Sequence, residues 1–348
     1  MEIIFLKANN GDSIYISSGN KNILIDTGTG ATYLSKPNGR PQNGELKSLI
    51  NDLQSKNEKI DLLVITHWDD DHIGGVLKWF KEDLESAKSM IKHIWFNSGL
   101  LINQYFQSDS AGGDKTIIDS EYNPNTSIRQ GITFEKYILD EELSYSLVKT
   151  DTANMDNIID GVKFTLLSPT DKELEKLLVE WEDSSYNPYT SASNKDYDKS
   201  FEELLQNEFK EDTAIHNGSS IVFILEIENK KMLFLGDAHP SIVVDSLKTS
   251  CYSKENKLKI DLMKVSHHGS KANTSDELLD IIECDNFVIS TDGSKHGLPN
   301  KETIARIINK HENCKIYFNY PELINQIFTE DELTNNNFET LDVKELSL

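Results

Sequence analysis

The stretch that decides the fold is Thr66-His67-Trp68-Asp69-Asp70-Asp71-His72-Ile73-Gly74-Gly75, which holds two histidines and three aspartates in six consecutive positions. The apolar residues 62–65 before it predict a buried strand, and residues 76–92 after it predict a helix. Five ionisable side chains on one tight loop would repel each other and lose solvation. Because carboxylates and neutral imidazoles are usual ligands of divalent cations, the stretch predicts a metal-binding loop in preference to a solvated acidic turn.

The chain has 348 residues, a formal net charge of -23 and a mean hydropathy of -0.47. These values predict a globular protein and disfavour non-specific binding along a nucleic-acid backbone, which depends on Lys and Arg. No apolar run reaches the roughly 20 residues that span a bilayer, and the first residues predict a strand in place of a signal peptide. Three widely spaced cysteines without a Cys-x-x-Cys pair favour reduced thiols. We therefore expect a cytoplasmic protein that has no membrane partner.

Short apolar runs separated by turn residues recur along the chain, and the first three of them predict a β-meander. Strands are predicted at 2–7, 13–17, 22–25, 62–65, 94–96, 161–167, 220–227, 231–235, 258–265 and 287–290, and further helices at 46–54 and 301–310. Residues 171–212 are acidic and polar, and we interpret them as a helical insertion around a loose loop. This insertion is either a cover over the site or a solvated spacer. One domain over residues 1–348 is expected to contain all of these elements.

Metal-type ligands recur where apolar strands begin or end. They are Asp26, His67, Asp69, Asp71, His72, Asn217, Asp237, His267 and His268. Ends of neighbouring strands can converge on one edge of a packed sheet, so we expect these side chains to meet there. Two-metal hydrolytic sites are built by such convergence, and their metals lower the pKa of bound water and hold the group that is attacked.

Four motifs occur in a fixed order along the chain. They are Asp26-Thr27-Gly28, His67-x-Asp69-x-Asp71-His72, Leu235-Gly236-Asp237 and His267-His268-Gly269-Ser270. In this order they resemble the metallo-β-lactamase superfamily, and most closely its ComEC-type branch, which groups the soluble domain of the competence DNA-uptake channel with many stand-alone hydrolases. The resemblance implies an α/β fold, the αββα sandwich of two mixed β-sheets flanked by helices, with metals at one edge.

The resemblance also implies the ligands of two divalent metal ions. One ion would take His67 and Asp69, the other would take Asp71 and His72, and Asp237 matches the carboxylate that bridges both. The position of Asp69 is a histidine in much of the superfamily. Because oxygen ligands favour harder ions, either Zn²⁺ or Mn²⁺ is expected in a site this rich in oxygen. Extra carboxylates also make a metal-bound water less acidic, so activity is expected to peak at alkaline pH.

Two ligand assignments stay open. His268 matches the last histidine of the superfamily pattern, and His267 is then either a supporting residue or the alternative ligand. Asn217 is preferred as a ligand or substrate contact, because the ComEC-type pattern has Asn there, and His216 is its rival.

The resemblance implies a metal-dependent hydrolase, above all a phosphodiesterase or nuclease in which a hydroxide bridging the two metals attacks phosphorus. Asp71 and Asn217 are its expected catalytic residues, together with His296, which lies on a Gly/Pro loop. Either His296 or a metal-bound water would protonate the leaving group, and His296 is alternatively a phosphate contact. The acidic chain favours a short or single-stranded nucleic acid, or a nucleotide, as the phosphodiester substrate. The alternatives are hydrolysis of carboxylic esters, lactones or amides, and a regulatory or partner-binding protein that keeps metals for stability.

Overall fold

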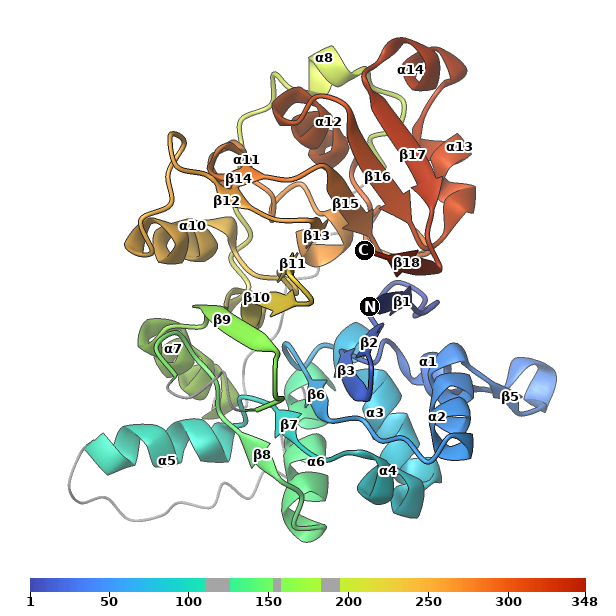
Figure 1. Ribbon diagram of the computed structural model, residues 1–348, viewed down its shortest axis with the longest axis vertical. Coiled ribbons are helices and arrows are strands. Elements are labelled where there is room, and N and C mark those ends of the chain that lie inside the picture. The colour runs from blue at the N-terminus through green and yellow to red at the C-terminus, as the bar shows by residue number, and fades with distance from the viewer. Residues whose placement is uncertain (110–125, 153–157, 183–194) are drawn as a thin grey trace.

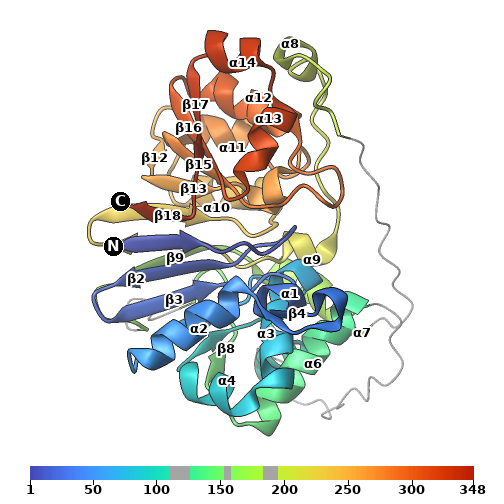
Figure 2. The ribbon, with the colours of Figure 1, turned by 90° about the vertical axis from the view of Figure 1, so that its right-hand side faces the viewer.

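The computed structural model describes residues 1–109, 126–152, 158–182 and 195–348. Two seven-stranded mixed sheets pack face to face, and helices cover their outer surfaces (Figure 1). Figure 2 shows the same layers from the side, with α12 and α14 at one end of the stack and α2, α4 and α6 at the other. The αββα sandwich predicted from the sequence is confirmed.

The first sheet begins with the predicted meander, because its first three strands pair antiparallel in chain order. The last strand of the chain, β18, returns to pair with β1, so the two termini lie close together (Figure 1). In spatial order its strands are β18 (Glu345–Ser347), β1 (Glu2–Phe5), β2 (Ile14–Ser18), β3 (Lys21–Ile25), β6 (Leu62–Val64), β7 (Ile94–Trp95) and β8 (Tyr145–Ser146).

The second sheet is antiparallel across β9, β10 and β11 and parallel from β11 to β17. In spatial order its strands are β17 (Phe338–Asp342), β16 (Cys314–Phe318), β15 (Asn286–Ile289), β13 (Leu262–Lys264), β11 (Lys230–Phe234), β10 (Val222–Ile227) and β9 (Lys163–Ser168). The single strand predicted over 258–265 was wrong. Its first part, β12 (Leu258–Lys259), pairs with β14 (Ile282–Glu283) outside this sheet. The chain changes partner here, because the Ile260 N–H donates to Glu283 whereas the Asp261 N–H donates to Lys231.

The helices divide between the two outer layers. Those beside the first sheet are α1 (Gly30–Tyr33), α2 (Glu45–Ser55), α3 (Asp70–Glu82), α4 (Leu84–Met90), α5 (Gly99–Asp109), α6 (Thr126–Asp140) and α7 (Asp171–Glu182). Those beside the second sheet are α8 (Phe201–Leu204), α10 (Pro240–Thr249), α11 (Asp276–Ile281), α12 (Lys301–Lys310), α13 (Ile324–Ile327) and α14 (Glu330–Asn335). The one helix predicted over 76–92 is α3 and α4, and α3 already begins at Asp70. Part of the acidic stretch therefore forms the first turn of a helix.

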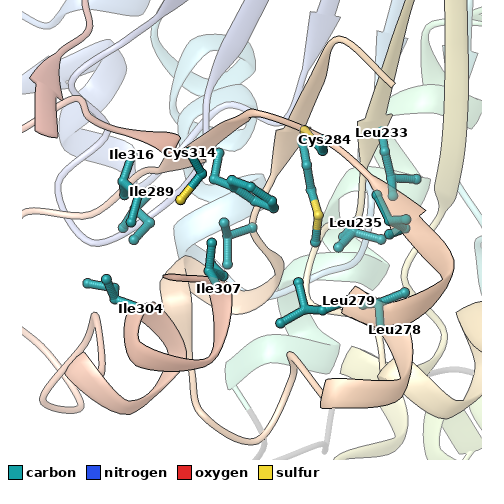
Figure 3. Packing of buried hydrophobic residues seen from close by; sticks show 14 of the residues in the cluster. Leu233, Leu235, Leu278, Leu279, Cys284, Ile289, Ile304, Ile307, Cys314 and Ile316 are labelled. Carbon is teal, nitrogen blue, oxygen red and sulfur yellow. The ribbon is translucent and has the colours of Figure 1, made fainter. Parts of the chain in front are cut away.

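Three clusters of buried apolar side chains fill the three spaces between the layers. Figure 3 shows the one between the second sheet and its helices, where Leu233 and Ile289 from strands face Leu279 of α11 and Ile307 of α12. Each fully buried side chain of this size contributes about 1.5–3 kcal/mol to folding. Both sheets are thus fixed to their neighbours on both faces, and the loops at their ends start from rigid strands.

The segment 171–212 contains α7 and α8, and its middle part, 183–194, lies outside the described residues. Trp181 of α7 packs edge-on against Trp68 of the acidic stretch, with ring centroids 4.9 Å apart. At least this end of the segment is therefore part of the first helical layer. No helix among the described residues has the length and apolar character that crossing a bilayer requires.

Candidate metal centre

The loop after β6 is clamped by the turn that follows β3. The Thr27 N–H donates to the carbonyl of His72 at 2.8 Å, and the Thr27 hydroxyl donates to the same carbonyl. Gly75 has to be a glycine, because a Cβ atom there would lie 2.0 Å from the Thr27 carbonyl oxygen. Asp69 is the N-cap of α3, with no side-chain capping bond, so its carboxylate remains available. Close backbone packing therefore fixes the direction in which the side chains of this loop point.

A first group of donor atoms surrounds the carboxylate of Asp237, which follows β11. His67 Nε2 lies 3.7 Å from Asp237 Oδ2, and His72 Nε2 lies 3.4 Å from Asp237 Oδ1. Asp69 Oδ2 lies 3.8 Å from His67 Nε2. On the other side of the His72 ring, Nδ1 is 2.8 Å from Asp26 Oδ2, which leaves Nε2 facing Asp237. Two ligands of one ion, each at about 2.0–2.2 Å from it, are separated by similar distances.

A second group of donor atoms lies next to His72, and it contains Asp71 and His268. His268 Nε2 is 3.3 Å from His72 Nε2, 3.4 Å from Asp71 Oδ2 and 3.8 Å from Asp237 Oδ2. The side-chain amide of Asn10 donates to Asp71 Oδ2 at 2.7 Å. Asp237 thus contacts both groups, which is the position that a bridging carboxylate needs.

His268 is held from behind by groups of both sheets. Its Nδ1 lies 3.0 Å from the carbonyl oxygen of Ser290 and 3.4 Å from Asp12 Oδ1. The other carboxylate oxygen of Asp12 accepts from Lys264 Nζ at 2.5 Å, and Lys264 is 1% exposed. A buried lysine next to the site therefore balances the charge of Asp12.

The turn that carries the histidine pair has an unusual backbone. His267 and His268 have φ values of 48° and 53°. A non-glycine residue in the left-handed region costs about 1–3 kcal/mol and is found most often at functional sites. His267 Nε2 lies 3.5 Å from Asp237 Oδ2, and its Nδ1 donates to Asn273 Oδ1 at 3.0 Å. The side chain of His267 is 25% exposed and that of His268 2% exposed, so both reach Asp237 but only His267 meets solvent.

His216 and Asn217, the two alternative ligands, are adjacent on the one-turn helix α9 (Ile215–Gly218), and His216 is the one that contacts the first group. Its Nε2 lies 3.3 Å from Asp69 Oδ2, and its ring stacks near His67 with centroids 6.5 Å apart. Asn217 instead donates from Nδ2 to Asp212 Oδ2 at 2.7 Å. The Asn217 Oδ1 atom is buried and has no hydrogen-bond partner among the described residues. The structure therefore brings His216 into the cluster and places Asn217 beside it.

His296 lies apart from the donor atoms, on an exposed turn after β15 where its φ is 55°. In the described part of the chain, no hydrogen bond or ion pair joins its ring to the cluster. The same loop still packs on the histidine turn, because the Asn300 N–H donates to the carbonyl of Gly269 at 3.0 Å. The structure thus places the loop beside the site and the His296 ring in solvent.

The cluster couples buried histidines to buried carboxylates. Burial alone would lower the pKa of His72 and of His268, but Asp237 and neighbouring carboxylates outweigh it and raise both, that of His268 to about 10. Burial, together with the charge of His72, lowers the pKa of His67 to about 4. Burial would raise the pKa of Asp237, but the histidines around it hold this pKa well below its usual range. Without a cation, protons on His72 and His268, but not on His67, balance the carboxylates.

The donor set fits divalent cations. His67 Nε2 and Asp237 Oδ1 are buried and have no hydrogen-bond partner among the described residues. Unpaired polar atoms in an interior are costly and call for a missing partner, which a bound ion supplies. Asp12, His72 and His268 form one set of three donor atoms that all lie within 4.8 Å of one another. His67, His72 and Asp237 form a second such set. Imidazole and carboxylate donors in this mixture suit Zn²⁺ or Mn²⁺.

Three residues around the site were not predicted from the sequence: Lys264, Glu180 and Asp212. Lys264 is a charged residue inside an apolar strand, and this position in the sequence indicates a lysine that is buried and paired with a carboxylate. Glu180 lies on the apolar stripe of α7 that Leu177 and Trp181 mark at helical spacing, and its 2% exposure shows that this carboxylate is buried. Asp212 lies in the acidic segment, where nothing in its neighbours distinguishes it from solvated residues.

Comparison with known proteins adds a family match to this geometry. A family model described as Metallo-beta-lactamase superfamily matches residues 6–83 and 162–293, which is more than half of the chain. ComE operon protein 3 of Bacillus subtilis (strain 168) is 22% identical over 317 residues, covering 89% of this chain and 31% of that protein. Beta-lactamase-like protein 2 homolog of Caenorhabditis elegans is 38% identical over 79 residues, covering 22% of this chain and 23% of that protein. The chain thus spans less than a third of the length of either relative.

Among solved structures, Zn²⁺-bound PqqB from Methylobacterium extorquens aligns over 100% of both chains, with a TM-score of 0.44 and 12% sequence identity. The metallo-β-lactamase fold protein YhfI from Bacillus subtilis aligns over 99% of this chain and 96% of its own, with a TM-score of 0.43 and 10% identity.

Proposed function

The chain belongs to the metallo-β-lactamase superfamily, whose members are metal-dependent hydrolases, and from this premise we propose that it is a two-metal phosphodiesterase. The preferred substrates are short or single-stranded nucleic acids, or nucleotides. The observation that carries the proposal is the shared position of Asp237, whose carboxylate lies within 3.8 Å of imidazole nitrogens in both donor groups. One carboxylate between two sets of donors is the arrangement that a dinuclear hydrolytic site requires.

The side chains divide into two proposed ligand sets. His67, Asp69 and His216 would hold one cation, and Asp71, His72 and His268 would hold the other, with Asp237 between them. His72 touches both groups and is placed in the second set because its Nε2 lies 3.3 Å from His268 Nε2. His216 takes the place first given to Asn217, because its Nε2 lies 3.3 Å from Asp69 Oδ2. Bound there, the cations would lower the pKa of water and neutralise negative charge that develops on the attacked group.

The chain's own residues have separate tasks in this proposal. Asp26 accepts from His72 Nδ1, which keeps the lone pair of Nε2 directed at the centre. Ser290 does the same for His268 through its backbone carbonyl. His267 is partly exposed and faces Asp237, so it is placed to hydrogen-bond an oxygen of the substrate. The loop with His296 packs against the histidine turn, so His296 is kept as the proposed proton donor to the leaving group.

The choice of a phosphodiester rests on the ComEC-type motifs, above all the aspartate at position 69. A net charge of -23 opposes long duplexes, whose binding needs many phosphate contacts from Lys and Arg. Small anionic substrates need only the cationic centre itself. This is why we place short or single-stranded substrates ahead of long duplexes.

The test uses protein stripped of metal and reloaded with Zn²⁺ or Mn²⁺. The substrates are bis(p-nitrophenyl) phosphate and labelled single-stranded and double-stranded DNA and RNA oligonucleotides, with a panel of neutral esters and lactones beside them. Asp71→Ala is the inactive control. Cleavage of the phosphodiesters that returns with metal and is absent from the variant supports the proposal.

Two other results would overturn the substrate class. Turnover of neutral esters or lactones without any phosphodiester cleavage assigns the centre to carboxylic substrates. Two tightly bound metals without turnover of any substrate favour a regulatory protein that keeps metals for stability.

A further inference from the structure

Helix α7 carries a carboxylate on its buried face. Leu174, Leu177 and Trp181 follow helical spacing and are at most 4% exposed. Glu180 lies on the same face and is 2% exposed. Burying an ionised carboxylate among apolar side chains is unfavourable unless it is paired and hydrogen-bonded, so this position needs a specific partner.

The partner of Glu180 is His216. Glu180 Oε1 lies 3.2 Å from His216 Nδ1, and His216 Nε2 lies 3.3 Å from Asp69 Oδ2. A carboxylate, an imidazole and a second carboxylate thus form a line that ends in the first donor group. Glu180 Oε2 is buried and has no hydrogen-bond partner among the described residues, so the pairing with His216 is the contact that this side chain makes there.

The neighbouring residue fixes the position of this carboxylate. Trp181 packs edge-on against Trp68, which lies inside the metal-binding loop, with centroids 4.9 Å apart. A Cβ atom at Gly99 would lie 2.4 Å from Trp181 Nε1, so the ring is seated closely against α5. One turn of α7 therefore contacts the loop through Trp181 and the His216 helix through Glu180.

We propose that Glu180 is a positioning residue of the metal centre. It accepts the Nδ1–H of His216, which fixes the tautomer in which the Nε2 lone pair faces Asp69. A carboxylate behind a metal-binding histidine fixes the ring and raises its basicity. This assignment rests on the proposed two-metal function, and it gives the start of the segment 171–212 a place in the centre itself.

The test compares metal binding by the wild type, Glu180→Gln and Glu180→Leu, with Glu175→Gln on the exposed face of the same helix as the matched control. Zn²⁺ affinity is measured by competition with a chelator, and the ligand field by the absorption spectrum of the Co²⁺-loaded protein. Loss of a carboxylate behind a ligand typically costs 10–100-fold in metal affinity. We expect about 100-fold for Glu180→Leu and about 10-fold for Glu180→Gln, whose amide oxygen still accepts from Nδ1. Both Glu180 variants should weaken the binding of one of the two ions and change the absorption spectrum of the Co²⁺-loaded protein. The Glu175→Gln control should match the wild type in affinity and spectrum.

A measurement on the wild type keeps the proposal testable should the variants not fold. Long-range ¹H–¹⁵N spectra of the Zn²⁺-loaded protein should show that the His216 ring carries a proton on Nδ1 and none on Nε2. A His216 ring protonated at Nε2, or variants with wild-type affinity and spectrum, would overturn the role of Glu180 and leave the metal centre standing. A wild type that binds no metal would overturn the proposed function and this assignment with it.

Discussion

His268 and His216 face the same centre but are held in different ways. His268 follows a strand of the second sheet, and its Nδ1 lies 3.0 Å from a backbone carbonyl that cannot be mutated away. His216 lies on a one-turn helix, and its Nδ1 contacts a single side chain, Glu180, that belongs to α7. The candidate metal centre thus has two halves, the donor group around His268 and the donor group around His216. The half around His268 is part of the sheet framework, whereas the half around His216 depends on an added helix. Changes in the first half should damage the protein, and changes in the second should tune its metal binding.

The largest effect is expected where both halves meet. Asp237→Asn leaves a neutral amide between the two donor groups and removes the charge that would attract both proposed ions. We expect metal-dependent turnover to fall at least ~1000-fold, which corresponds to about 4 kcal/mol of transition-state stabilisation. The measurement is hydrolysis of bis(p-nitrophenyl) phosphate at saturating metal, with the exposed Asp245→Asn as control. Turnover within tenfold of the wild type would show that Asp237 does not join the halves.

The next effect concerns the framework behind His268. Asp12 and Lys264 form a buried pair with side chains 2% and 1% exposed. Removing one partner of such a pair leaves an unpaired charge and typically costs about 3–5 kcal/mol. Asp12→Leu should lower the free energy of unfolding by this amount in urea titrations of metal-free protein, and adding Lys264→Met should recover most of it.

The control for this prediction is the exposed pair of Lys259 and Glu283. Its side chains are 77% and 54% exposed, and Lys259→Met should change the free energy of unfolding by less than about 1 kcal/mol. A similarly small loss in Asp12→Leu would show that the half around His268 is no more rigid than the surface.

A smaller effect is expected at His72, which lies between the halves. Asp26 accepts from His72 Nδ1 at 2.8 Å and also accepts from the backbone N–H of Thr66. Asp26→Asn should keep the turn and weaken Zn²⁺ binding by about 10–100-fold, because the ring loses the carboxylate that fixes its tautomer. Chelator competition measures the affinity, and thermal melting of the metal-free protein reports whether the turn has changed. Unchanged affinity would mean that the backbone alone orients His72.

The same two halves separate what the sequence predicts from what it does not. The loop 67–72, Asp237 and the pair His267-His268 each follow an apolar strand directly, so local order along the chain reveals both the strand and the candidate donor side chains at its end. The apolar runs locate individual strands, whereas the layers of the fold were expected from the resemblance of the ordered motifs to the superfamily. The predicted strand over 258–265 failed because its two parts have the same mixture of apolar residues and one lysine, and only the change of partner at Asp261 separates them.

The half around His216 depends on contacts that local order does not contain. His216 and Asn217 are adjacent, and on a helix adjacent residues point about 100° apart. Which of them faces the centre depends on how the single turn of α9 is seated, and Glu180 of α7, 36 residues earlier, contributes to that. A carboxylate on an apolar stripe was a readable signal of burial, but its partner is a tertiary contact.

The last effect expected is a pH dependence in which metal binding and stability respond in opposite directions. In the metal-free protein the carboxylates raise the pKa of His268 to about 10 and raise those of His72 and His216. These rings are therefore protonated at neutral pH and must lose a proton to coordinate a cation, so Zn²⁺ affinity should rise by up to about tenfold per released proton for each pH unit. Calorimetric titrations between pH 6.5 and 8.5 in buffers of different ionisation enthalpy measure that release.

The stability of the metal-free protein should follow the opposite sign. A histidine whose folded pKa is raised above about 6.5 stabilises the fold fully below that value, and this contribution is lost as pH rises toward its folded pKa. Urea titrations of metal-free protein should therefore show a free energy of unfolding that falls from pH 6.5 to 8.5 while Zn²⁺ affinity increases. The Glu180→Gln variant should lose part of both trends, because one raised pKa depends on that carboxylate, whereas the share from His268 should persist. Metal binding without proton release in the wild type would show that the rings are already neutral and that the carboxylates do not control the centre.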